Sequence, residues 1–212
     1  MKLKLLLSGI LFLALSCSEN KSKTENDNTK ATEEKENPET KKESSSDVKP
    51  LFGIKAAKIV FNYTGGAEQG TETFYFDDYG AVAVLVIDKK SKYTVNNQTI
   101  IWKDKKSTLI NHDTKKVANS PFRPKDTEPP GIADISASSR NGIGYEKIAD
   151  KTIAGKNCEV WFNKKMNIKY YLWNKIDLKL ENQGVYVKEA TSVEEISAIP
   201  ASLFEIPGSY NQ

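Results

Sequence analysis

The sequence predicts a mainly β protein, built as an antiparallel meander that closes or partly closes into a barrel. Many short segments are rich in Val, Ile, Tyr, Phe, Thr and Trp, which suit a half-buried pleated surface. Short turn-forming clusters separate these segments, and no βαβ spacing is present, which argues against a doubly wound nucleotide-binding sheet. The predicted strands are 55–64, 71–79, 81–88, 99–103, 108–112, 144–153, 157–162, 168–174, 178–181 and 184–193.

Turn chemistry supports five of the boundaries between these strands. Gly, Asn and Asp tolerate the backbone conformations that tight turns require. They are concentrated between the predicted strands, so consecutive strands are expected to pair as hairpins. The turn segments are Thr64-Gly65-Gly66, Asp77-Asp78-Tyr79-Gly80, Asp104-Lys105-Lys106, Asn163-Lys164-Lys165 and Asn182-Gln183-Gly184.

One segment interrupts the meander. Residues 119–131 contain Pro121, Pro124, Pro129 and Pro130, and proline cannot donate to a central ladder. The following residues, 132–140, are expected to form a short helix. A long Pro-rich crossing is either a structural crossover that covers an open sheet edge or a flap that gates a ligand.

The N-terminus is typical of an export signal. Two lysines, Lys2 and Lys4, precede an apolar run over 5–15 that is too short to span a bilayer as a permanent helix. We therefore expect residues 1–16 to be a bacterial lipoprotein signal peptide used in Sec-type export. Ala14 and Ser16 also suit ordinary signal peptidase, which would cut at the same bond without adding lipid.

Cys17 is the expected lipidation site, where a diacylglyceryl group and an acyl chain such as palmitate would be attached. Residues 18–49 contain Ala31 and Val48 as their apolar residues and are otherwise polar and charged. Such a composition does not bury enough surface to offset the entropy of ordering. Residues 17–49 are therefore predicted to be a lipidated cysteine and a disordered tether, followed by one β domain over 50–212.

The net charge of the chain indicates which classes of partner are expected. The formal net charge is +3, with positive and negative residues interspersed. Nucleic-acid binding favours a basic stripe and a large net charge, so it is not expected here. The expected partners are a membrane, through the N-terminal lipid, and a hydrophobic ligand or an unknown protein. We expect the protein in the cell envelope, at the outer membrane rather than the inner one.

The residues that could carry catalysis form no recognised pattern. His112 is the single histidine, which excludes a multi-histidine metal site. Asp77 and Asp78 fit a hairpin turn better than a carboxylate pair, and Cys158 alternates with Val160 and Phe162 as a buried strand residue would. No nucleophile elbow or phosphate-cradling loop is present. We expect no catalytic residue, metal or cofactor.

Aromatic residues alternate along several predicted strands. They either pack in a core or line an apolar concavity that receives a lipid or an acyl chain, and the pattern alone leaves both open. The candidate ligand-binding residues are Phe61, Phe74, Trp102 and Trp173.

Several motifs carry a resemblance to a known family. The chain resembles uncharacterised lipoproteins of Bacteroidetes-type bacteria over most of residues 51–208, and its C-terminal segments are similar to the ending of outer-membrane lipoprotein carrier-like proteins. The motifs are Phe74-Tyr75-Phe76-Asp77-Asp78-Tyr79-Gly80, 151–161, 172–179, 188–192 and Leu203-Phe204-Glu205-Ile206-Pro207.

The resemblance implies an incomplete antiparallel barrel with a helix or loop across its open side. In carrier-type relatives the concavity holds acyl chains, but those carriers are soluble, whereas this chain is expected to keep its own lipid. The expected function is therefore a membrane-anchored, non-enzymatic lipoprotein that binds an apolar ligand or partner in a half-barrel. The alternatives are an interaction lipoprotein with a filled core and an unrecognised hydrolase.

Overall fold

A computed structural model describes residues 50–66, 68–121 and 132–210. All of them belong to one compact unit, Ser46–Gln212. The predicted signal peptide, Cys17 and the tether lie outside the described residues, as does most of the Pro-rich segment. Their predicted roles are therefore not addressed by the structure.

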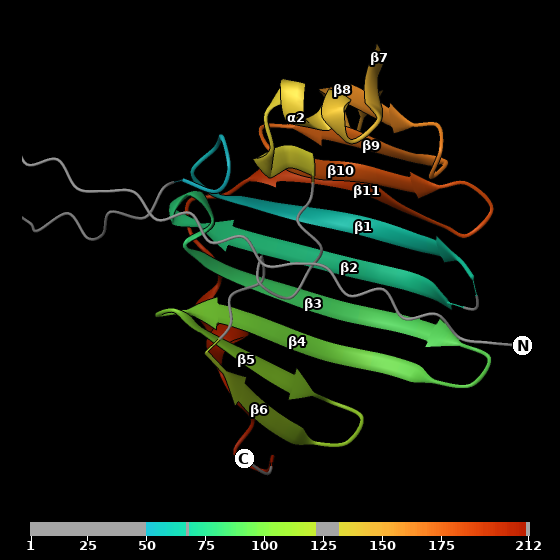
Figure 1. Cartoon of the computed structure of the whole chain (residues 1–212). Helices are drawn as coiled ribbons and strands as arrows, with labels where there is room; N and C mark the ends of the chain where they lie inside the picture. The colour runs from blue at the N-terminus through green and yellow to red at the C-terminus, as the bar shows by residue number, and fades with distance from the viewer. Residues whose placement is uncertain (1–49, 67, 122–131, 211–212) are drawn as a thin grey trace, which may run out of the picture. The chain divides into compact units, whose positions relative to one another are not determined.

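The described strands form a single antiparallel sheet of eleven strands (Figure 1). This confirms the predicted fold class, a mainly β protein with an incomplete barrel, because the sheet does not close on itself. The strands are β1 (Ala57–Gly65), β2 (Glu68–Asp77), β3 (Val82–Ser91), β4 (Val95–Lys103), β5 (Lys106–Asn111), β6 (Lys116–Ser120), β7 (Tyr145–Ile153), β8 (Lys156–Asn163), β9 (Ile168–Trp173), β10 (Ile176–Asn182) and β11 (Tyr186–Glu195).

Two meanders make up the sheet, and they meet at its centre. The spatial order is β6-β5-β4-β3-β2-β1-β11-β10-β9-β8-β7, so the first and last strands of the chain pair with each other. All other neighbouring strands are consecutive in sequence. The turns β4–β5 and β9–β10 have both central residues at positive φ, at Asp104-Lys105 and Asn174-Lys175, which matches the right-handed twist of hairpin strands.

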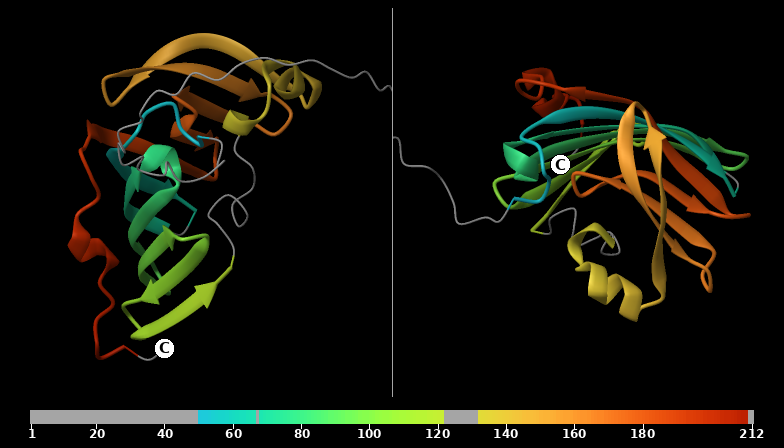
Figure 2. Two further views of the ribbon diagram at one scale, coloured as in Figure 1. Left: turned by 90° about the vertical axis from the view of Figure 1, so that its left-hand side faces the viewer. Right: turned by 90° about the horizontal axis from the view of Figure 1, so that it is seen from above.

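The sheet curls strongly across the second meander. The ammonium of Lys156 in β8 lies 3.7 Å from a carboxylate oxygen of Glu195 in β11, although β9 and β10 separate these strands in the sheet. Register shifts between Val60 and Phe61 and between Asp177 and Lys179 accompany the curl. A bulge adds local twist and bends a strand. Figure 2 shows β7 and β8 arching across the end of the other strands.

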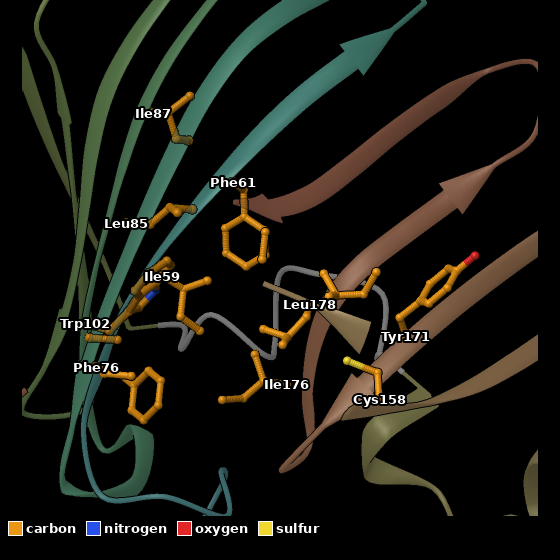
Figure 3. Packing of buried hydrophobic residues seen from close by; sticks show 14 of the residues in the cluster. Ile59, Phe61, Phe76, Leu85, Ile87, Trp102, Cys158, Tyr171, Ile176 and Leu178 are labelled. Atoms are coloured by element: carbon orange, nitrogen blue, oxygen red, sulfur yellow. The ribbon is translucent and has the colours of Figure 1, made fainter. Parts of the chain in front are cut away.

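The main core lies between the two meanders (Figure 3). Its largest fully buried side chains are Phe76 and Ile59 from the first meander and Leu178 from the second, each with no exposed surface. We call this cluster the central core, and the face of β1–β4 that carries it the inner face. It contains Ala57, Ile59, Phe61, Phe76, Ala83, Leu85, Ile87, Trp102, Ile153, Cys158, Val160, Tyr171, Ile176, Leu178 and Ala190.

The C-terminal segment covers the other face of the first meander. Val84 and Ile101 alternate with central-core residues and therefore point to that other face. Ile199, Leu203 and Phe204 pack against them, the last two from the 3-10 helix η3 (Ala201–Phe204). His112 is half-buried there, and its ring nitrogens form hydrogen bonds with Thr99 and Tyr210.

A short helical segment packs against the second meander. The predicted helix over 132–140 is present as two pieces, η2 (Ile132–Asp134) and α2 (Ala137–Gly142), the second capped by Ser136. Ile132 packs with Trp161 and Leu172, which alternate with central-core residues of β8 and β9. Arg140 fixes α2 by donating to the Ile132 carbonyl at 2.6 Å and by lying over the Trp161 ring.

Strand β6 was not predicted. No strand was predicted between 108–112 and the Pro-rich crossing from residue 119, whereas the ladder with β5 runs from Lys116 to Ser120. An edge strand needs one neighbour and one packed side chain, here Val117, so its sequence carries little alternation. Its remaining residues are polar or small and resemble a loop.

The state of Cys158 generates a direct test. Its side chain has no exposed surface, and burial raises the pKa of the thiol. Thiol reagents attack the thiolate, so we expect no labelling by iodoacetamide in the native protein and full labelling in denaturant. Purified residues 50–212 serve as the sample, because they contain Cys158 as their single cysteine. Stoichiometric native labelling, read by mass spectrometry, would contradict the packing described.

Candidate functional site

All four predicted ligand-binding residues converge on the central core. Phe61, Phe74 and Trp102 lie on the inner face of β1, β2 and β4, and Trp173 comes from β9. Phe61 is 3% exposed and Trp102 is 7% exposed, so both are core residues in this conformation. Phe74 and Trp173 are half-buried at the margin of the cluster. A ligand could therefore reach the last two directly.

Strand register arranges the inner face in successive rows. Phe76, Ala83 and Trp102 pair in one row, which is fully packed. The next row is Phe74, Leu85 and Ile100, in which Phe74 and Ile100 remain half-buried. We call this second row the apolar strip. It marks the part of the inner face where the core reaches accessible surface.

Residues 51–55 run across one end of the inner face. The backbone amides of Leu51 and Phe52 both donate to the Tyr79 carbonyl, at 3.0 and 3.1 Å, and that of Gly53 donates to the Asn174 carbonyl at 2.9 Å. The Phe52 ring packs against Phe74, with ring centroids 5.9 Å apart, and against Phe76 at 4.5 Å. This segment thereby connects the two meanders.

The Asp77-Asp78-Tyr79-Gly80 motif has a structural reason. It forms the turn between β2 and β3, with Asp77 accepting from the Asp78 amide and Tyr79 at φ 55°. A Cβ added to Gly80 would lie 2.8 Å from the Phe52 ring, in a backbone conformation that favours glycine. Gly80 therefore leaves the space that the Phe52 ring occupies. The prediction of a hairpin turn at this motif is confirmed.

Toward the other end of the strands the inner face becomes charged. Glu72 occupies the row after the apolar strip, between Phe61 and Ile87, and is 5% exposed. Its carboxylate contacts the ammonium groups of Lys89 from β3 and Lys188 from β11. We call these three residues the ionic triad. Both lysines also lie near aromatic rings, Lys89 at 3.9 Å from the Tyr63 centroid and Lys188 at 4.6 Å from that of Phe61.

Gly70 makes room for this arrangement. It lies opposite both Tyr63 and Lys89 in the ladders of β2. A Cβ at this position would approach the Asp88 carbonyl oxygen to 2.2 Å, so no larger residue fits. With no side chain between them, Lys89 and Tyr63 meet across β2.

Glu72 is not among the site residues predicted from the sequence. It lay inside the predicted strand 71–79, where it alternates with Phe74 and Phe76 and so shares their face. A carboxylate in an otherwise apolar stripe requires a partner, because a buried unpaired charge is costly. That was the available signal, but the partners Lys89 and Lys188 come from other strands and could not be identified from spacing.

A second ionic network lies on the opposite side of β10 and β11. Lys179 is paired with Glu189 at 2.9 Å, and Tyr171 donates to Glu181 at 3.0 Å. Burial, followed by this hydrogen bond, raises the pKa of Tyr171 to about 12. Lys179 neighbours the ladder position of Lys188 but points to the other face, so it is a matched control for the triad.

The described residues also form a shallow polar hollow of about 420 Å³. It lies at the far end of β1–β3, and none of the four predicted ligand-binding residues lines it. Its lining residues are Asn62, Tyr63, Thr64, Gln69, Gly70, Thr71, Asp88 and Lys90. Within the described ranges, no group of three or more His, Cys, Asp or Glu side chains is arranged to hold a metal ion, and no helix has the length and apolarity to cross a membrane.

Comparisons with known proteins identify no family, but several solved structures have a similar course of the chain. No family model and no curated protein matches the chain. Among solved structures, MucB is similar over 76% of this chain and 60% of its own, with 11% identity and a TM-score of 0.48. The Pseudomonas aeruginosa MucA/MucB complex gives 15% identity and a TM-score of 0.48 over 73% of this chain and 57% of that chain.

An uncharacterised conserved protein from Thermus thermophilus gives 7% identity and a TM-score of 0.49, over 74% of this chain and 88% of that one. The match to MucB covers 60% of that protein, so this chain spans less than two thirds of the length of MucB. At these identities the likeness concerns the course of the chain alone. The resemblance to Bacteroidetes-type lipoproteins stays a prediction.

The ionic triad predicts a pH-dependent stability. Burial raises the pKa of Glu72, but the charges and hydrogen bonds of Lys188 and Lys89 outweigh it, so the pKa lies below its usual 4.5. A lowered folded-state pKa stabilises the protein above pH 4.5 and loses that contribution as the pH falls through the folded value. We expect Glu72→Gln to lower the stability near pH 7 by about 3 kcal/mol.

Urea unfolding of residues 50–212 at pH 7 and at pH 3.5 provides the measurement. The difference between wild type and Glu72→Gln should shrink at the lower pH. Glu189→Gln, which removes a half-buried carboxylate from the other face, serves as the control and should cost less than about 1 kcal/mol. An equal loss in both variants at pH 7 would contradict the stabilising role of the triad.

Proposed function

We propose that this protein is a lipid-anchored binding protein of the cell envelope that holds the apolar chain of a ligand on its inner face. The observation that carries the proposal is the apolar strip, where half-buried Phe74 and Ile100 extend the packed central core to the surface. The role is that of a binding or carrier protein, and the ligand is of the acyl type.

The energetics suit an extended apolar chain. Burial of hydrocarbon contributes about 0.8 kcal/mol per CH₂, without directional requirements. Strands present a continuous surface, and successive inner-face rows of β2–β4 are two residues, or about 6.6 Å, apart along the strands. Phe52, which now packs on Phe74 and Phe76, already occupies this surface with an aromatic ring. A ligand would extend that contact or replace it.

The proposed localisation in the cell envelope rests on the N-terminal sequence. Lipidation of Cys17 after export would tether the domain to a membrane, with residues 18–49 as the spacer. We favour the outer membrane, with binding rather than catalysis as the role. In support of a non-catalytic role, the single histidine, His112, is engaged with Thr99 and Tyr210 on the face opposite the apolar strip.

A second candidate is an interaction lipoprotein whose core is filled and which binds through edges and loops. The full burial of Phe76, Ile59 and Leu178 favours it, because these side chains leave no accessible surface at the centre of the cluster. In this case Phe74 and Trp173 stabilise the fold and contact no ligand. The two candidates make different predictions for the same substitutions.

For the binding role, we expect residues 50–212 to bind a fluorescent fatty acid and Phe74→Lys to weaken this binding at least tenfold while the domain stays folded. A charge on the apolar strip removes the contact with the chain, but the half-buried position lets the ammonium reach water. Tyr75→Lys is the matched control, since Tyr75 is half-buried on the other face of the same strand. Trp173→Lys tests whether the half-buried Trp173 on β9, at the margin of the central core, also contacts the ligand.

Fluorescence titration and circular dichroism of each variant decide between the candidates. Folded variants with selective loss of binding in Phe74→Lys support the binding role. If the wild type does not bind and Phe74→Lys and Trp173→Lys both unfold, the residues belong to a filled core, and the scaffold role replaces the proposal.

For the anchor, we expect Cys17→Ala to abolish membrane retention or to leave an uncleaved precursor. Two or three acyl chains, at about 0.8 kcal/mol per buried CH₂, dominate anchoring. Fractionation and immunoblotting of cells expressing the full chain provide the measurement, with Ser18→Ala as the control. A processed Cys17→Ala protein that remains in the membrane fraction would show that the anchor lies elsewhere.

A further inference from the structure

We propose that the ionic triad of Glu72, Lys89 and Lys188 is a binding site for the carboxylate headgroup of the ligand. The inference rests on the proposed function, because it assigns the polar end of the molecule whose chain would lie on the apolar strip. It is carried by the position of the triad and by its charge.

The ionic triad follows the apolar strip along strands β2 and β3. Phe74, Glu72 and Gly70 follow one another at alternate positions of β2, and Leu85, Ile87 and Lys89 do so on β3. The inner face therefore changes from apolar to charged along the strands. Lys89 lies four residues from Leu85, which corresponds to about 13 Å. An extended chain that crosses the apolar strip and runs along β2 and β3 would therefore place its end at the triad.

The charge of the triad is positive. Two ammonium groups surround one carboxylate, so their sum is +1 and the ammonium groups keep unused donors. Glu72 is the fixed counter-charge in the unliganded protein, where it contacts both lysines. Glu68, the next carboxylate on this face of β2, lies beyond Gly70 on the side away from the apolar strip. Glu72 itself lies in the row between the strip and the lysines, so a bound anion would meet its charge, and the lysine donors that Glu72 leaves unused would have to outweigh it.

The lysines are placed to bridge apolar and polar groups. Lys188 lies 4.6 Å from the centroid of the Phe61 ring and is more exposed than Lys89. Such a side chain covers apolar surface with its stem while its ammonium meets a charged group.

The test compares dodecanoate with 1-dodecanol, which have the same chain and differ in headgroup charge. Isothermal titration calorimetry of residues 50–212 at pH 7.5 measures both. We expect dodecanoate to bind about tenfold more tightly, the effect of one charge-assisted hydrogen bond. Lys188→Gln should remove this preference without changing the affinity for dodecanol, whereas Lys179→Gln, on the other face, should leave the preference intact.

Glu72→Gln provides a test in the opposite direction. It frees both lysines from their counter-charge, so we expect dodecanoate to bind more tightly than to the wild type and dodecanol to bind unchanged. Because this variant is expected to lose stability in either case, the binding preference decides: a preference for dodecanoate that is unaltered from the wild type would overturn the inference.

The remaining outcomes separate the two proposals. Equal binding of dodecanoate and dodecanol by the wild type overturns the headgroup site but keeps the apolar strip. Binding of neither amphiphile overturns the proposed function itself. Loss of the dodecanoate preference in Lys179→Gln would place the anion on the opposite face and also overturn the inference.

Discussion

The pairing of β1 with β11 is the contact on which the rest of the structure depends. It joins the first and last strands of the chain, so each meander completes the sheet of the other. Without it the face of β1 would lose the partner that brings Ala190 beside Phe61, and the central core would divide. A register shift between Val60 and Phe61 bends this junction, which lets side chains from β8–β10 reach those of β1–β4.

The same junction creates the polarity of the inner face. At one end the segment through Phe52 and the β2–β3 turn seal the core with apolar side chains. At the other end Lys188 of β11 meets Glu72 of β2 across β1. A buried carboxylate is tolerated there because two ammonium groups from different strands compensate its charge. The resulting gradient from apolar to charged is the basis of both proposals for a ligand.

Each meander needs one further layer, and both layers come from irregular segments. The C-terminal residues around Phe204 cover β3–β5, and the residues from Ile132 through α2 cover β8 and β9. The edge strands differ in their protection. β6 is short and mostly polar, while β7 carries a register shift between Ile148 and Lys151 and many exposed charged residues. These are the usual means by which an open sheet avoids pairing with another chain.

Local patterns in the sequence determined ten of the strands, the hairpin turns and the short helical segment. Each rests on interactions between neighbouring residues, such as the positive φ at Asp104-Lys105 and the alternation of Cys158 with Val160. The same patterns grouped Phe61, Phe74, Trp102 and Trp173 as inward-facing aromatics. Lipidation of Cys17 and the tether also come from sequence and stay predictions.

The tertiary structure decided what depends on distant partners. β6 is a strand because β5 offers it a ladder, and its own residues carry no alternation strong enough to show this. Burial separated Phe61 and Trp102 in the packed core from Phe74 and Trp173 at its margin, since exposure depends on what lies across the sheet. The ionic triad emerged for the same reason. Its three charges belong to three strands, and a charge selects its partner by position in space, which spacing along the chain does not encode.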